Sequence, residues 1–190
     1  MNVQDYIKVY ENIVSENLCN ALMKAKFDYK SSSFSSHTET YEDSTNRVIM
    51  DDFWIRKDNN FYNPLKECFV KAVRQYEYEF PRFECEHTTD FRINRYGTGG
   101  FMSEHVDNIH HSHGQKWGYP HVSALLYIND DYEGGEIEFP LKKYSYKPRA
   151  NSLVVFPSTN EYLHGVKKIT KGTRYTVAIW FTQDFAHIEV

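Results

Sequence analysis

The sequence predicts a mainly β fold, of the sandwich, jelly-roll or barrel kind, with helices at its N-terminal end. After residue 81, short runs rich in β-branched and aromatic residues alternate with turn signals such as GTGG and NDDYEGG. Before that point, two segments carry apolar residues at helical spacing. We therefore expect a jelly roll, similar in architecture to cupins, with supporting helices.

The N-terminal third should supply one strand and one short helix before a long loop. Residues 5–14 are rich in β-branched and aromatic side chains, which favours a strand. Ser15 can cap a helix over residues 16–27. Residues 30–47 are polar and rich in Ser and Thr, and follow neither period. This loop is either a lid over the site or a passive insertion.

The strongest helix signal covers residues 63–80. Asn63 can cap this helix, and Pro64 suits its first position. An apolar stripe follows at helical spacing and should pack against a sheet. The stripe consists of Leu65, Phe69, Ala72, Val73 and Tyr76.

The length of 190 residues suits a single domain, with residues 1–85 as support and lid and 86–184 as the jelly-roll core. The formal charge of −4 does not favour non-specific binding to nucleic acid. No apolar run approaches membrane-spanning length, so no membrane partner is expected. The three widely spaced cysteines form no C-x-x-C pair, which fits a reducing compartment. We expect a soluble, intracellular, cytoplasmic protein.

His105 and Asp107 form a His-x-Asp pair in a run that should be extended. On a strand, residues two apart face the same way, so both side chains can reach one metal ion. Two rival patterns exist, His37-x-Glu39 and His187-x-Glu189. The pair alone therefore does not decide between a metal site and two polar surface residues.

A later strand-forming run supplies His164 as a third ligand candidate. Two histidines and one carboxylate form the facial triad of non-haem Fe(II) oxygenases, which leaves coordination positions open. Zinc hydrolases also use two histidines and an acid, so the residues alone leave the metal undecided.

Arg174 begins an otherwise apolar strand ten residues after His164. The turn TKGT between them predicts a hairpin that returns Arg174 to the level of the metal. A guanidinium is costly to bury without an anion, and arginine binds carboxylates well. Thr176 and Tyr127 can assist at the same carboxylate. The alternative is an exposed charge at the end of a hairpin.

Together these residues resemble the 2-oxoglutarate- and Fe(II)-dependent dioxygenases, in particular the prolyl 4-hydroxylase branch. The resemblance covers roughly residues 90–183, through segments such as RYGTGGFMSEHVDN, LLYIND, GGEIEF and TRYTVAIWF. An arginine at position 174, where collagen-type enzymes have lysine, is more similar to the oxygen-sensing prolyl hydroxylases and their microbial relatives. Residues 1–85 match only in the general order of their elements.

The resemblance implies a double-stranded β-helix that uses Fe(II), 2-oxoglutarate and dioxygen, with ascorbate as a stimulant. Iron would be held by His105, Asp107 and His164. The distal carboxylate of 2-oxoglutarate would pair with Arg174, assisted by Tyr127 and Thr176. Tyr96 and Trp180 match aromatic residues near the site in this branch, and His121 is a further pocket candidate.

The implied reaction is hydroxylation of a proline in a peptide, at carbon 4. Two alternatives stay open: the same chemistry on a free amino acid or other small molecule, and a non-catalytic metal-free or zinc-bound jelly roll. An exposed groove beside residues 30–60 would favour a peptide. Trp54 and Trp117 could pack on the proline ring, or simply fill the core or rim. The histidine-rich insert over residues 108–121 departs from the branch and is expected to be a solvated loop.

Overall fold

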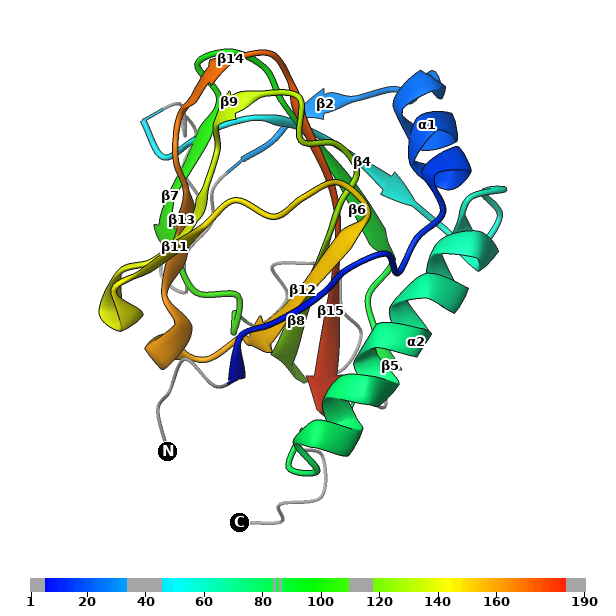
Figure 1. Cartoon of the computed structure of the whole chain (residues 1–190), viewed down its shortest axis with the longest axis vertical. Coiled ribbons are helices and arrows are strands. Elements are labelled where there is room, and N and C mark those ends of the chain that lie inside the picture. The colour runs from blue at the N-terminus through cyan, green and yellow to red at the C-terminus, as the bar shows by residue number, and fades with distance from the viewer. Residues whose placement is uncertain (1–5, 34–45, 84, 86, 110–117, 184–190) are drawn as a thin grey trace.

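The computed structural model describes residues 6–33, 46–83, 85, 87–109 and 118–183. Figure 1 shows a β-barrel flanked by helices α1 (Glu16–Lys24) and α2 (Tyr62–Glu79). The predicted lid lies mostly outside the described residues, as do His37 and His187. Trp117 and most of the histidine-rich insert also lie outside them.

The larger sheet has eight strands, and neighbouring strands in it run antiparallel. Its order is β1 (Lys8–Tyr10), β12 (Ser152–Pro157), β8 (Tyr119–Tyr127), β15 (Arg174–Gln183), β6 (Phe91–Tyr96), β4 (Asp51–Ile55) and β2 (Lys30–Ser31). Strand β5 (His87–Thr88) pairs with the far end of β15.

The smaller sheet contains five strands and is joined by a two-stranded ribbon. Its order is β11 (Tyr144–Tyr146), β10 (Ile137–Phe139), β13 (His164–Val166), β7 (Phe101–His105) and β3 (Val48–Ile49), and the ribbon pairs β14 (Ile169–Lys171) with β9 (Glu133–Gly134).

The chain alternates between the two sheets. Strands β6, β8, β12 and β15 belong to the larger sheet, and β7, β10 and β13 fall between them in sequence and belong to the smaller one. This alternation is the wiring of a jelly roll, or double-stranded β-helix, and confirms the predicted fold class. It also places segments far apart in sequence on the inner walls of one barrel.

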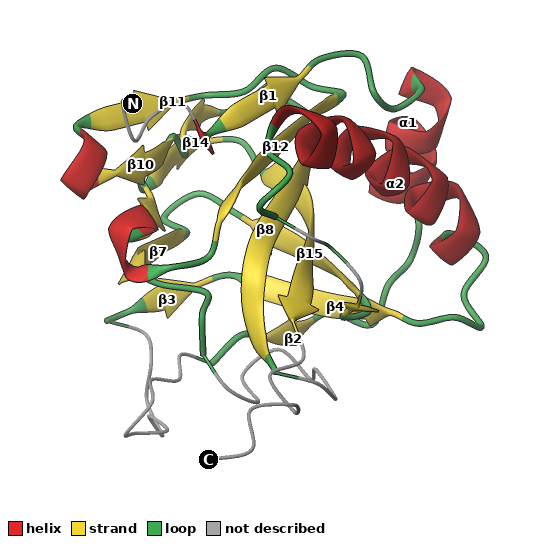
Figure 2. Ribbon diagram, turned by 90° about the horizontal axis from the view of Figure 1, so that it is seen from below, coloured by secondary structure: helices red, strands yellow, loops and turns green. Residues whose placement is uncertain are grey.

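Helix α2 covers the outer face of the larger sheet, and Figure 2 shows it lying beside β8, β12 and β15. The apolar stripe of α2 is buried in the main core, as predicted. Strand β15 contributes Val177, Ile179 and Phe181 to this core. Because side chains alternate along a strand, Arg174, Thr176 and Trp180 face the barrel interior instead.

Three local predictions about the helices and strands need comment. Helix α1 is capped as expected, since the Ser15 hydroxyl accepts from the backbone N–H of Leu18 at 3.3 Å. Asn63 as the cap of α2 was wrong: the helix begins at Tyr62, and its N-cap residue Phe61 makes no side-chain capping bond. The strand predicted over residues 5–14 is limited to Lys8–Tyr10.

The hairpin predicted between His164 and Arg174 was also wrong. Strand β13 lies in the smaller sheet and β15 in the larger one, and the intervening β14 pairs with β9. The chain therefore crosses between sheets before it reaches Arg174. In the described helices, no segment is both long and apolar enough to cross a membrane.

Candidate active site

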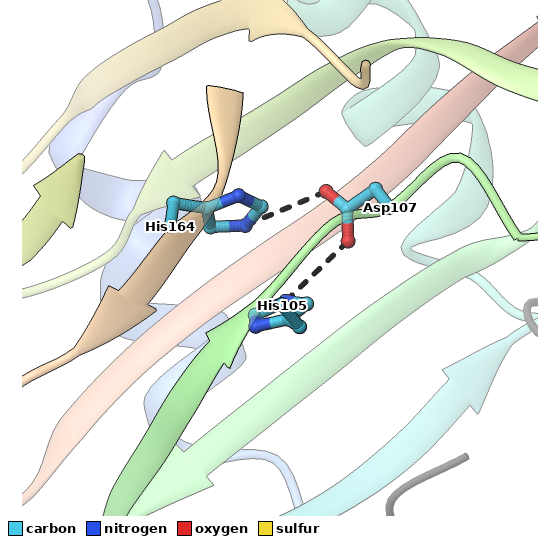
Figure 3. A group of neighbouring side chains, drawn as sticks. All are labelled: His105, Asp107 and His164. Atoms are coloured by element: carbon cyan, nitrogen blue, oxygen red, sulfur yellow. Dashed lines mark ion pairs between the residues drawn. The ribbon is translucent and has the colours of Figure 1, made fainter. Parts of the chain in front are cut away.

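Three side chains meet where β7 and β13 run side by side. His105 is the last residue of β7, His164 is the first of β13, and the two are paired in register. Asp107 lies two residues beyond β7, in the segment that leaves the strand. Figure 3 shows both imidazoles turned toward the Asp107 carboxylate. The sequence prediction that these residues converge is met, although Asp107 lies past the strand end.

The geometry of this cluster is compact. The Nε2 atoms of His105 and His164 each lie 3.5 Å from one carboxylate oxygen of Asp107. One ligand atom from each residue falls within 4.8 Å of the others, and Asp107 and His164 are each only 4% exposed. The spacing suits three ligands on one side of a single cation.

Backbone contacts orient both imidazoles. Nδ1 of His105 lies 2.9 Å from the carbonyl oxygen of Ser103, and Nδ1 of His164 lies 3.0 Å from that of Tyr162. A carbonyl can only accept, so each Nδ1 carries the proton and donates. Nε2 is then the nitrogen that faces Asp107 and offers a lone pair. This is the tautomer in which histidine binds a metal.

Ser123 fixes the carboxylate. Its hydroxyl donates to Oδ2 of Asp107 at 2.6 Å and lies 2.8 Å from the hydroxyl of Ser158. Ser123 and Ser158 are both buried. This contact holds the orientation of the acid that the metal would need.

Arg174 lies in the same barrel, at the start of β15, and is only 1% exposed. One of its Nη atoms donates to the hydroxyl of Tyr127 at 3.1 Å. Its guanidinium carbon lies 4.9 Å from the ring centres of Tyr96 and Tyr127. Among the described residues no carboxylate pairs with it, and its Nε is buried without a hydrogen-bond partner.

Two other buried polar atoms lack hydrogen-bond partners among the described residues. These are the Tyr132 hydroxyl, near Arg174, and Oδ1 of Asn94, near Thr176. Burial raises the pKa of the Tyr96 and Tyr127 hydroxyls, and the nearby Arg174 cation partly opposes this. Both therefore stay protonated at neutral pH. A buried cation ringed by neutral hydroxyl groups fits an incoming carboxylate.

The remaining predicted site residues are distributed along the cavity wall. Thr176 is buried, and its Oγ1 lies 3.5 Å from Nδ2 of Asn94. Trp180 pairs in register with Ser123, which connects it to the candidate metal ligands. His121 packs on the ring of Phe83 at 5.2 Å. The structure brings Thr176, Tyr96 and Trp180 to the cavity, and His121 is engaged with an aromatic neighbour.

Sequence reasoning missed Tyr132, Ser123 and Arg92. Tyr132 and Arg174 both pack over Gly135, where a Cβ atom would lie 3.0 Å from the Tyr132 ring and 3.1 Å from Cδ of Arg174. The GG pair at positions 134 and 135 is a turn signal in the sequence. The sequence does not reveal that Tyr132 lies next to Arg174 there. Ser123 and Arg92 face the cavity through strand alternation, which becomes informative only once the register is known.

The comparisons with known proteins agree on one superfamily. Residues 91–182 match the family model described as the 2OG-Fe(II) oxygenase superfamily. Human prolyl 3-hydroxylase 2 is 49% identical over 67 residues, which are 33% of this chain and 10% of that protein. Chicken prolyl 3-hydroxylase 1 is 42% identical over 72 residues, also 10% of its length. The chain thus spans about a tenth of the curated relatives it matches.

Solved structures share the fold at low sequence identity. A Pseudomonas putida prolyl-4-hydroxylase has a TM-score of 0.70 at 19% identity and covers 96% of this chain and 97% of its own. The viral collagen prolyl hydroxylase from Paramecium bursaria Chlorella virus-1, in a 2OG complex, has a TM-score of 0.68 at 16% identity and covers 92% and 94%. His105, Asp107, His164 and Arg174 thus all fall within residues 91–182, the segment that is similar to the 2OG-Fe(II) oxygenase superfamily.

Proposed function

We propose that the protein is an Fe(II)- and 2-oxoglutarate-dependent dioxygenase that hydroxylates a prolyl residue in a peptide or protein. The observation that carries this is the presence, in one barrel, of a His-Asp-His cluster and a buried arginine that has no carboxylate partner among the described residues. Burying both groups costs folding free energy, and a jelly roll with a purely structural role would not need either. The described elements would act as one catalytic domain.

His105, Asp107 and His164 would hold Fe(II). The bound iron, with 2-oxoglutarate and dioxygen, supplies an oxidant able to hydroxylate an unactivated C–H bond. The protein's part is to orient the ligands through Ser123 and the two backbone carbonyls, and to keep the site dry. Ascorbate as a reductant belongs to the same proposal.

Arg174 would bind the distal carboxylate of 2-oxoglutarate. Tyr127 accepts a hydrogen bond from Arg174. Its own proton is then free to point at the carboxylate. Thr176 and Tyr96 line the same region, and the Tyr132 hydroxyl offers another donor. These neutral donors and the Arg174 cation match a ligand that carries a negative charge at this end.

A surface groove beside residues 30–60 supports a peptide substrate. An exposed groove at this place favours a peptide over a small molecule as the substrate. The groove has a volume of about 480 Å³. Its lining combines Phe53 and Trp54 with charged and polar residues, namely Asp28, Lys30, Asp52, Arg56, Asp58 and Asn59. An extended peptide could lie there and present one ring to the barrel, since proline limits its own backbone freedom.

The position on the proline ring is a separate part of the proposal. The sequence resemblance implied carbon 4, whereas the curated relatives are named prolyl 3-hydroxylases. We keep carbon 4 as the proposal.

The test incubates the protein with Fe(II), ascorbate, 2-oxoglutarate and a library of single-proline peptides. A gain of one oxygen on proline, found by fragmentation and placed on the ring by NMR, is expected. The Asp107→Asn variant should give none. Oxygen on a non-proline residue, or turnover stimulated by free amino acids alone, would contradict the prolyl peptide assignment.

A further inference from the structure

Arg92, the second residue of β6, packs against two tryptophans. It pairs in register with Trp54 of β4 and with Ala178 of β15. Its guanidinium carbon lies 4.7 Å from the Trp180 ring centre and 5.8 Å from that of Trp54. The two indole rings are 6.2 Å apart. Both indoles lie within cation–π distance of the guanidinium and limit its movement.

No described residue uses the N–H edge of Arg92. Within the described parts of the chain Arg92 forms no ion pair, and its Nε is buried without a hydrogen-bond partner. Arg95, on the opposite face of the same strand, behaves differently. It donates to Asp51 at 2.7 and 3.2 Å and packs on the ring of Tyr29. Arg95 thus has the carboxylate partner expected of an arginine with a structural role, and Arg92 has none among the described residues.

Arg92 faces the interior of the barrel, next to a residue of the surface groove and to a residue of the candidate metal site. It shares its face of β6 with Asn94 and Tyr96. Trp180, which it contacts, is paired with Ser123, the residue that bonds Asp107. Trp54, which it also contacts, lines the groove. Arg92 is also partly exposed, whereas Arg174 is fully buried.

Asp52, on the neighbouring strand β4, does not form an ion pair with Arg92 among the described residues. It pairs in register with Asn94, lines the groove and accepts a hydrogen bond from the hydroxyl of Ser32.

We propose that Arg92 determines substrate specificity by binding a carboxylate close to the residue that is hydroxylated. The inference rests on the proposed function and deepens it. In a peptide the carboxylate would be an acidic side chain next to the target proline. In a free amino acid it would be the α-carboxylate itself. Both present the planar acceptor that a guanidinium can bind through two N–H groups.

The experiment compares wild type with Arg92→Met, Arg92→Lys and the control Arg95→Met. The probes are single-proline peptides in pairs, with Glu or Gln at each position flanking the proline, and free proline against prolinamide. Two quantities are measured: substrate-dependent oxygen incorporation, and binding to the Mn(II)- and 2-oxoglutarate-loaded protein, followed by tryptophan fluorescence.

Wild type should favour the carboxylate member of at least one pair by about tenfold or more, as expected for a charged hydrogen bond. Arg92→Met should lose the preference, and Arg92→Lys should keep part of it because the charge remains. The Michaelis constant for 2-oxoglutarate and its substrate-free turnover should not change. Arg95→Met should retain the preference.

An unchanged preference in Arg92→Met would overturn the proposal, and so would wild type binding both members of every pair equally. A raised Michaelis constant for 2-oxoglutarate in Arg92→Met would assign Arg92 to the co-substrate and also overturn it. If wild type consumes no 2-oxoglutarate at all, the proposed function fails. The fluorescence titration still decides the role of Arg92 in that case.

Discussion

The two faces of the larger sheet have opposite chemistry, although the same strands build both. Toward α2, strand β15 presents Val177, Ile179 and Phe181 to an apolar core. Toward the barrel it presents Arg174, Thr176 and Trp180, and the neighbouring β6 adds Arg92 and Asn94. One face contributes folding energy through burial of apolar area. The other leaves buried polar atoms unsatisfied, which costs folding energy until a ligand binds.

The comparison teaches that the alternation of a strand separates stability from function at adjacent positions. Substitutions on the helix-facing side should lower the free energy of unfolding and leave ligand affinity unchanged. Substitutions on the cavity side should lower ligand affinity and leave the free energy of unfolding unchanged. Each prediction below tests that separation, in order of decreasing effect.

Asp107→Asn should reduce 2-oxoglutarate turnover to background. The neutral amide removes the negative ligand from the cluster of His105 and His164, so Fe(II) is lost. Metal content after dialysis and turnover should fall together, while circular dichroism shows a folded protein. Normal iron content in this variant would remove Asp107 from the proposed ligand set.

Phe69→Ala should destabilise the fold by about 3–5 kcal/mol, because the ring is buried between α2 and the sheet and leaves a cavity. Denaturant unfolding measures the loss. Affinity for 2-oxoglutarate, measured where the variant is folded, should match wild type. A large loss of affinity in the folded variant would break the separation of the two faces.

Arg174→Met should weaken 2-oxoglutarate binding by about 2–5 kcal/mol, because the co-substrate carboxylate loses its cation. Metal affinity should persist. The free energy of unfolding without ligand should not fall, since no described carboxylate pairs with Arg174. Unchanged co-substrate affinity would place the 2-oxoglutarate pocket elsewhere.

Ser123→Ala should give the smallest effect, about 10- to 100-fold in metal affinity. The variant removes the hydrogen bond that orients Asp107 but keeps all three proposed ligands. Competition with a chelator measures the change. Affinity equal to wild type would mean that the carboxylate is oriented without Ser123.

The sequence identified the residues whose roles depend on short spacings. The His105-x-Asp107 pair, the later His164 and an arginine in an apolar strand could all be noticed without a fold. The stripe of α2 was equally visible, because helical periodicity is local. Ser15 was recognised as a cap for the same reason.

The features that could not be predicted from the sequence depend on which strands pair and in which register, across segments far apart in the chain. Arg92 becomes noticeable only when β4, β6 and β15 lie side by side, which brings Trp54 and Trp180 around it. Tyr132 becomes noticeable only when the fold packs it with Arg174 over Gly135. The mistaken hairpin before Arg174 has the same origin, since a turn signal does not reveal which strand the next segment pairs with.

Calorimetric titration tests the central claim most directly: that the cavity face of the sheet is a joint site for a metal and a carboxylate ligand. Mn(II) is titrated first, as an air-stable probe, and 2-oxoglutarate second, into wild type, Asp107→Asn and Arg174→Met. Wild type should bind one Mn(II) per chain and then one 2-oxoglutarate. Asp107→Asn should bind no Mn(II), and Arg174→Met should bind Mn(II) with weakened 2-oxoglutarate affinity. Wild-type protein that binds neither, or variants that bind both as wild type does, would contradict the account.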